Sequence, residues 1–98
     1  ILIAMYGATI GKLGILPLPA ATNQACCACN VIQPFYNLYL FYFLMANKTN
    51  FVKQGEGGAQ PNISREKITK TLIPIPPANE QHNIVSKIER INSILANL

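Results

Sequence analysis

The sequence contains no aspartate, and its four acidic residues, all glutamates, stand against eight lysines and arginines. Metal-dependent nucleases cluster carboxylates around a cation, whereas these four glutamates are well separated in the sequence. The only histidine, His82, is predicted in the first turn of a helix, where we expect it to be solvated. Because nucleophilic catalysis needs a base beside the nucleophile, nothing supports catalysis by this chain. Its net charge of +4 favours a polyanionic partner, though weakly.

The sequence also has no hydrophobic run long enough for a membrane span. The longest, PFYNLYLFYFLMAN, is too short and contains Asn37. The start shows neither a basic region nor the small-residue cleavage site of a secretory signal. It has no initiator methionine, and ILIAMYG reads as the middle of a strand, so we expect that an N-terminal part is missing. These features predict a cytoplasmic protein that makes no membrane contact.

Three cysteines lie close together, at Cys26, Cys27 and Cys29. A zinc site needs spaced pairs and further ligands, and His82 is far away in the sequence. Small apolar side chains on a buried strand are the better interpretation, because cysteine packs well there. An odd number of thiols without a secretory signal also fits a reducing compartment. We therefore expect neither a metal nor any other cofactor.

Two stretches resemble nucleotide and methyltransferase motifs only superficially. GATIGK has three residues between its glycines, where a phosphate-binding loop has four, and Leu13 replaces the hydroxyl residue that holds magnesium. IPIPPANE has Ile75 and Ala78 where an adenine methyltransferase motif needs a polar and an aromatic side chain. Neither activity is therefore predicted.

Apolar runs and turn residues predict an α+β fold: a small twisted sheet, packed helices and a projecting C-terminal amphipathic helix resembling a coiled coil. The sheet would have strands at 1–6, 13–16 and 24–32. A helix at 35–45, apolar on nearly all sides, should be buried. Residues 53–62 read as a loop, Ser64 as the N-cap of a short helix ending at 70, and 72–76 as an extended connector.

The C-terminal segment shows the clearest periodicity. Its large apolar residues alternate by four and three positions, as the a and d positions of a heptad seam do. Two heptads are too few to establish a coiled coil, and a terminal helix packed on its own domain is the alternative. The predicted interface residues are Ile84, Ile88, Ile91 and Leu95, with Leu98 next in the series.

Polar side chains suited to DNA contact fall in the predicted turns. Amides pair bidentately with adenine edges, and lysine binds guanine or phosphate. Loops held by a rigid sheet suit such recognition, although asparagine and glutamine in turns often bond their own backbone instead. The candidate DNA-binding residues are Thr9, Lys12, Asn23, Gln24, Gln60 and Asn62.

Four segments occur in the order that a known family shows: GATIGKLGIL, ATNQACCACN, GGAQPNIS and IPIPPANEQHNIV. Together they cover essentially the whole chain, and the most specific element is the proline run followed by Glu-Gln and an isoleucine. The sequence resembles the specificity subunit of type I restriction–modification systems. The resemblance implies that residues 1–77 are the C-terminal part of a target-recognition domain and that residues 78–98 begin a spacer helix.

The resemblance further implies a non-catalytic subunit that reads one half of a split site in double-stranded DNA. It would dock methyltransferase subunits and, through them, the restriction subunit, while methyl transfer and ATP-driven cleavage would belong to those partners. Two alternatives stay open at this point. One is a helix-mediated protein-interaction domain with no nucleic-acid role, and the other is the recognition end of a fused restriction–modification enzyme.

Overall fold

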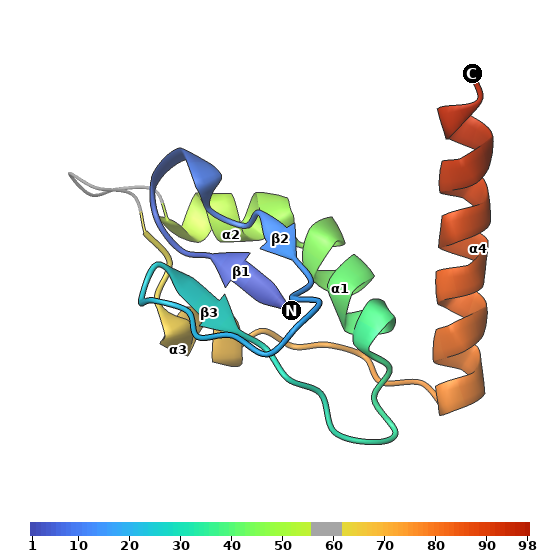
Figure 1. The fold of residues 1–98 in the computed structure, drawn as a ribbon, viewed down its shortest axis with the longest axis horizontal. Coiled ribbons are helices and arrows are strands. Elements are labelled where there is room, and N and C mark those ends of the chain that lie inside the picture. Colours follow the sequence, from blue (N-terminus) through green and yellow to red (C-terminus); the bar gives the residue numbers. More distant parts are fainter. Residues whose placement is uncertain (56–61) are drawn as a thin grey trace.

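A computed structural model describes residues 1–55 and 62–98 and has at its centre a three-stranded antiparallel sheet in the order β2-β1-β3 (Figure 1). The central strand, β1 (Leu2–Ala4), pairs on one side with β2 (Leu13–Gly14) and on the other with β3 (Cys26–Ala28). All three strands lie within the predicted ranges, and each is shorter. The predicted α+β class is confirmed by this sheet and the helices around it.

Two glycines make the turn that joins β1 to β2. Gly7 begins the short 3-10 helix η1 (Gly7–Thr9) with φ of 64°, and Gly11 has φ of 82°, in the left-handed region that favours glycine. The Gly11 amide donates to the Ala4 carbonyl at 2.9 Å, and the Ala4 amide donates to the Lys12 carbonyl at 3.0 Å. These bonds fix the turn at the end of the sheet.

Four α-helices are assigned in the described residues: α1 (Asn37–Ala46), α2 (Lys48–Gly55), α3 (Arg65–Thr69) and α4 (Ala78–Ala96). The predicted cap of α3 is confirmed, because the Ser64 hydroxyl accepts the Lys67 amide at 3.2 Å. The prediction of a loop from residue 53 onward is wrong for its first three residues, which belong to α2. Phe51 in this helix is fully buried, and such burial outweighs the poor helix propensity of its asparagine, threonine and glycine neighbours.

The hydrophobic core lies between the sheet and α1, α2 and α3. Ile3, Phe51 and Ile63 are at most 1% exposed, and full burial of each such side chain contributes about 1.5–3 kcal/mol. The prediction that α1 is buried is wrong for most of its residues. Its side chains are mostly half-buried, with Tyr39 and Leu44 buried and Met45 exposed.

The start of α4 is fixed to the start of α1 through Gln81, whose side chain has no exposed surface. Its Oε1 accepts the Tyr36 amide and its Nε2 donates to the Pro76 carbonyl, both at 2.8 Å. The Tyr36 ring stacks on His82 with ring centroids 3.7 Å apart. His82 is exposed, as predicted, although its ring contacts that of Tyr36. We call this set of contacts the α1–α4 junction.

Further contacts extend the junction on both sides of Gln81. The Tyr39 hydroxyl donates to the Pro74 carbonyl at 2.7 Å, which ties the proline-rich connector to α1. Further along the two helices, burial raises the pKa of the Tyr42 phenol, and the negative charge of Glu89 raises it further. The connector, α1 and the first half of α4 are therefore held together by polar contacts as well as by packing.

The second half of α4 projects away from the rest of the fold (Figure 1). Val85 is buried, and Ile84 and Ile88 are half-buried, so packing on its own domain describes the first half of the helix. By contrast, Ile91 and Leu95 are 56% and 58% exposed. No helix in the described part of the chain is both long and apolar enough to cross a membrane.

Candidate nucleic-acid interface

Three turns meet at the end of the sheet that lies farthest from α4 (Figure 1). The first is η1, the second is the loop that enters β3, and the third is the segment that precedes α3. Met5 joins them, because its amide donates to the Ala25 carbonyl at 3.0 Å and its carbonyl accepts the Ile63 amide at 2.8 Å. An isolated bridge between Tyr6 and Asn62 adds a second link. Residues far apart in the sequence thus form one surface.

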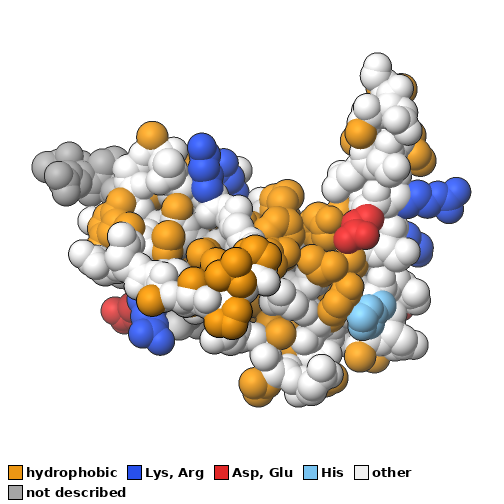
Figure 2. Space-filling view, viewed as in Figure 1, with side chains coloured by type: hydrophobic (Ala, Val, Ile, Leu, Met, Phe, Trp, Pro, Cys, Tyr) orange, Lys and Arg blue, Asp and Glu red, His pale blue; other side chains and the backbone are white. Residues whose placement is uncertain are grey.

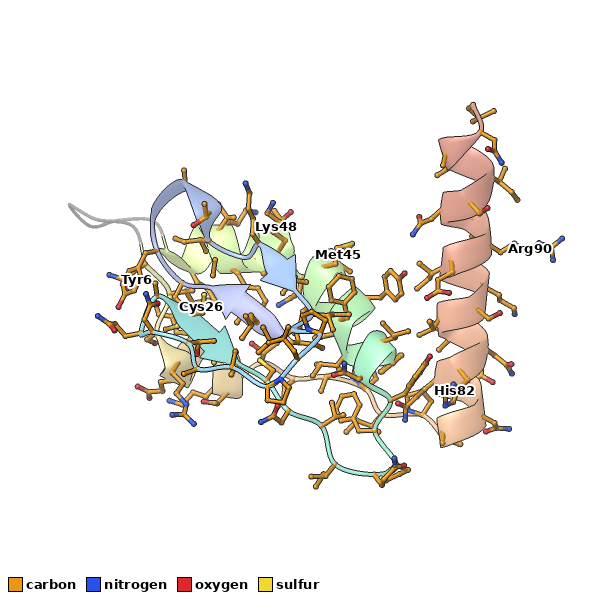
Figure 3. All side chains as sticks on the ribbon, viewed as in Figure 1. Tyr6, Cys26, Met45, Lys48, His82 and Arg90 are labelled. Atoms are coloured by element: carbon orange, nitrogen blue, oxygen red, sulfur yellow. The ribbon has the colours of Figure 1, made fainter. Side chains whose placement is uncertain are left out.

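A hollow of about 450 Å³ opens on this surface, and we call it the sheet-end hollow. Its polar lining comes from Tyr6, Gln24 and Arg65, over a floor that includes Met5 and Cys27. Figure 3 shows Tyr6 and Cys26, another lining residue, at this same end of the sheet. The hollow brings together an aromatic ring, an amide and a guanidinium group.

These three groups are the ones that nucleic acid recognition uses. An amide can pair with two adjacent atoms of an adenine edge, and a guanidinium group can pair with guanine or with phosphate. An aromatic ring that is 45% exposed, as Tyr6 is, offers a stacking surface for a base or a sugar. The three groups together are therefore suited to binding a nucleic acid.

The predicted DNA-binding residues differ in what their side chains do. The Thr9 hydroxyl donates to the Tyr6 carbonyl at 3.0 Å, and the Asn23 Oδ1 accepts the Ala25 amide at 3.0 Å. Both of these side chains therefore stabilise their own turns. For Asn23, this is the alternative to DNA contact that the sequence left open. Lys12 and Gln24 are exposed, and of these two only Gln24 lines the hollow.

Two candidates come from the third turn. Gln60 lies outside the described residues. Asn62 is exposed and takes part in the bridge to Tyr6, so it also supports the backbone of this surface. Tyr6 and Arg65 were missed by the sequence reasoning. Tyr6 ends the first apolar run directly before Gly7, and Arg65 follows the Ser64 cap, and both of these signals are visible in the sequence.

Positive charge is concentrated in one part of the chain. Residues 48–70 contain five of the eight lysines and arginines, against two of the four glutamates. Figure 2 shows the basic side chains of one face in separate groups, on the body of the molecule and on α4. These five basic residues belong to α2, to α3 and to the residue after α3, and among them only Arg65 lines the sheet-end hollow: Lys48, Lys53, Arg65, Lys67 and Lys70.

Cys26 and Cys27 lie in β3 and Cys29 follows it, with Cys27 buried and the other two half-buried. Burial, and then the neighbouring Cys27, raises the pKa of the Cys29 thiol, which disfavours the thiolate that a metal would need. In residues 1–55 and 62–98, no group of three or more histidine, cysteine or acidic side chains could hold a metal ion.

Comparison with known families gives a match that covers almost the whole chain. The model of the type I restriction modification DNA specificity domain matches residues 1–97. No solved structure matches the chain. Since the family match spans more than half of the sequence, the chain belongs to this family, and the resemblance found in its four motifs is confirmed.

Proposed function

We propose that this member of the type I DNA specificity family reads one half of a split target site through the sheet-end hollow and its flanking turns. The family match gives the chain a role in DNA specificity. The finer division is our proposal: residues 1–77 recognise DNA, and residues 78–98 begin a spacer helix. The chain would itself be non-catalytic and work in the cytoplasm.

The observation that carries this proposal is the gathering of Tyr6, Gln24 and Arg65 around one hollow from three distant parts of the sequence. Base recognition needs such side chains on a rigid support. The support here is the sheet itself, because Tyr6 lies just beyond β1 and Gln24 just before β3. Gln24 would read a base edge, and Arg65 would bind guanine or phosphate.

Lys12 would have a different role from Gln24. It follows η1 on the exposed side of the turn, and as a flexible point charge it suits a phosphate. Thr9, Asn23 and Asn62 would contribute mainly by holding the turns that present these groups. Gln60 is retained as a DNA-contacting candidate on its sequence position alone.

The proposed partners of this chain are the other subunits of the restriction–modification complex. We propose that methyltransferase subunits dock on the protein and that the restriction subunit associates through them. The exposed Ile91 and Leu95 continue the seam of Ile84 and Ile88, so the free half of α4 would pair with another helix. Methyl transfer and ATP-driven cleavage would then be the work of the partner subunits.

The test compares Gln24→Ala with Lys12→Gln in the purified specificity subunit, on duplexes that carry the target sequence mapped by its methylation and on scrambled duplexes. Loss of a bidentate base contact by Gln24→Ala should cost about 1–3 kcal/mol on the target and much less on scrambled DNA. Lys12→Gln should weaken both duplexes about equally and reduce the slope of log K against log salt by about 0.9.

Gln33→Ala is the matched control, because Gln33 is also an exposed glutamine in a turn but does not line the sheet-end hollow. It should bind both duplexes as the parent does. If Gln24→Ala keeps the full preference of the parent for the target over scrambled DNA, the hollow does not read bases and the proposal is wrong.

A further inference from the structure

A second hollow, of about 470 Å³, lies between α2 and α3, and we call it the α2–α3 hollow. Residues two positions apart on a helix point to nearly opposite sides, so α3 directs Arg65 into the sheet-end hollow and Lys67 into this one. The other polar side chains that line the α2–α3 hollow are Asn47, Asn50, Gln54, Lys70 and Thr71.

Most of these side chains are held in place by hydrogen bonds. The Lys67 ammonium donates to the Gln54 carbonyl at 2.9 Å, across the hollow from α3 to α2. The Asn50 side chain donates through its Nδ2 to Asn47 Oδ1 at 2.8 Å. An ammonium group has three donors, so Lys67 keeps donors for a ligand while its position is already fixed.

Lys70 supplies a second cation at the edge of the hollow. Its ammonium lies 2.7 Å from the Glu66 carboxylate, and both side chains are more than 70% exposed. Exposed pairs of this kind are worth little and exchange readily with other partners. An anion of higher charge density could therefore replace Glu66 as the partner of the Lys70 ammonium at a small cost in free energy.

The side chains that line the hollow are suited to binding an anionic polymer. It offers ammonium and amide donors, with no aromatic ring and no carboxylate among the lining residues. The hollow is a shallow surface depression and would enclose little of a small metabolite, which normally binds with most of its surface covered. A phosphodiester backbone fits, since successive phosphates need donors along an open track.

We propose that the α2–α3 hollow binds the phosphodiester backbone of DNA. This inference rests on the proposed function, and it adds a contact surface that the sequence reasoning did not foresee. Contacts to phosphate position a protein on DNA without reading sequence. Lys67 and Lys70 would thus contribute affinity on every duplex, while Gln24 contributes preference.

The experiment measures binding of target and scrambled duplexes over a salt series for Lys67→Gln/Lys70→Gln in the purified specificity subunit. Two lost phosphate contacts should lower the slope of log K against log salt by about 1.8, and each should weaken binding about eightfold at 0.1 M salt. The effect should be equal on both duplexes. Lys87→Gln/Arg90→Gln, which removes two exposed charges from α4, is the matched control and should behave as the parent does.

A gain-of-charge variant covers the case in which the double variant folds poorly. Asn50→Lys adds a cation to the lining from an exposed position on α2. It should strengthen binding of both duplexes and raise the salt slope by about 0.9. If both variants match the parent in slope and affinity, the hollow does not contact DNA and the inference is overturned.

Two further outcomes separate this inference from the proposed function. If DNA binding is unchanged but association with the methyltransferase subunit weakens in Lys67→Gln/Lys70→Gln, the hollow binds an acidic protein surface and the inference is overturned. If the parent shows no preference for target over scrambled DNA, the proposed function fails, whatever the salt slopes are.

Discussion

Replacing Gln81 by leucine removes the polar centre of the α1–α4 junction while keeping a side chain of similar size. The Tyr36 amide and the Pro76 carbonyl would each lose the 2.8 Å hydrogen bond that Gln81 gives them. A buried backbone group left without a partner costs about 1–3 kcal/mol. Both bonds are only partly buried, so we expect a total near the low end, about 2–3 kcal/mol.

That loss is a large share of the roughly 5–15 kcal/mol by which proteins of this kind are stable. Urea unfolding should show a lower midpoint with an unchanged slope, and amide exchange should be fastest in residues 78–89 if α4 detaches first. Asn83→Leu is the control, because Asn83 lies on the same helix with its side chain exposed. Equal stability of Gln81→Leu and Asn83→Leu would refute the view that Gln81 anchors α4.

Two further predictions follow from the turn and from the free half of α4. Gly11→Ala should destabilise the protein by at least about 1–2 kcal/mol, because Gly11 has φ of 82° and an added Cβ would lie 2.9 Å from Lys48 Cγ. Gly14→Ala, with nothing within 4 Å of its Cβ, should change the melting temperature little, and equal melting temperatures for the two variants would contradict this argument. Ile91→Asp should leave stability nearly unchanged, since Ile91 is 56% exposed, but should abolish helix pairing and assembly, because an unpaired charge is costly in an apolar seam. Ser93→Asp, on another side of α4, is its charge-matched control, and normal assembly of Ile91→Asp in size-exclusion chromatography would show that the seam has no partner.

The sequence predicted the elements whose cause is local. The Ser64 cap, the glycine turn and the start of α4 behind the prolines follow from backbone chemistry within a few residues. By contrast, α2 depends on Phe51, which is fully buried against the rest of the core. Such a helix is stabilised by contacts with residues that are distant in the sequence, and the local sequence pattern does not indicate those contacts.

The candidate site was predictable in its location more than in its members. Glycines and amides marked the turns that the structure brings together, but they could not show that Thr9 and Asn23 bond their own backbones. Arg65 joins Gln24 only because the segment before α3 pairs with Met5. Whether a side chain in these turns supports its own backbone or lines the hollow depends on that pairing, which the sequence alone does not show.

The α1–α4 junction has a consequence for the precision of any assembly built on α4. Nineteen residues make a helix about 28 Å long, and its last residue that is not exposed is Ile88. A tilt of about 10° at the base would move the far end by roughly 5 Å, which exceeds the 3.4 Å between neighbouring base pairs. The rigidity of the contacts around Gln81 would therefore set the precision with which a partner bound at the C-terminal end of α4 is positioned relative to DNA.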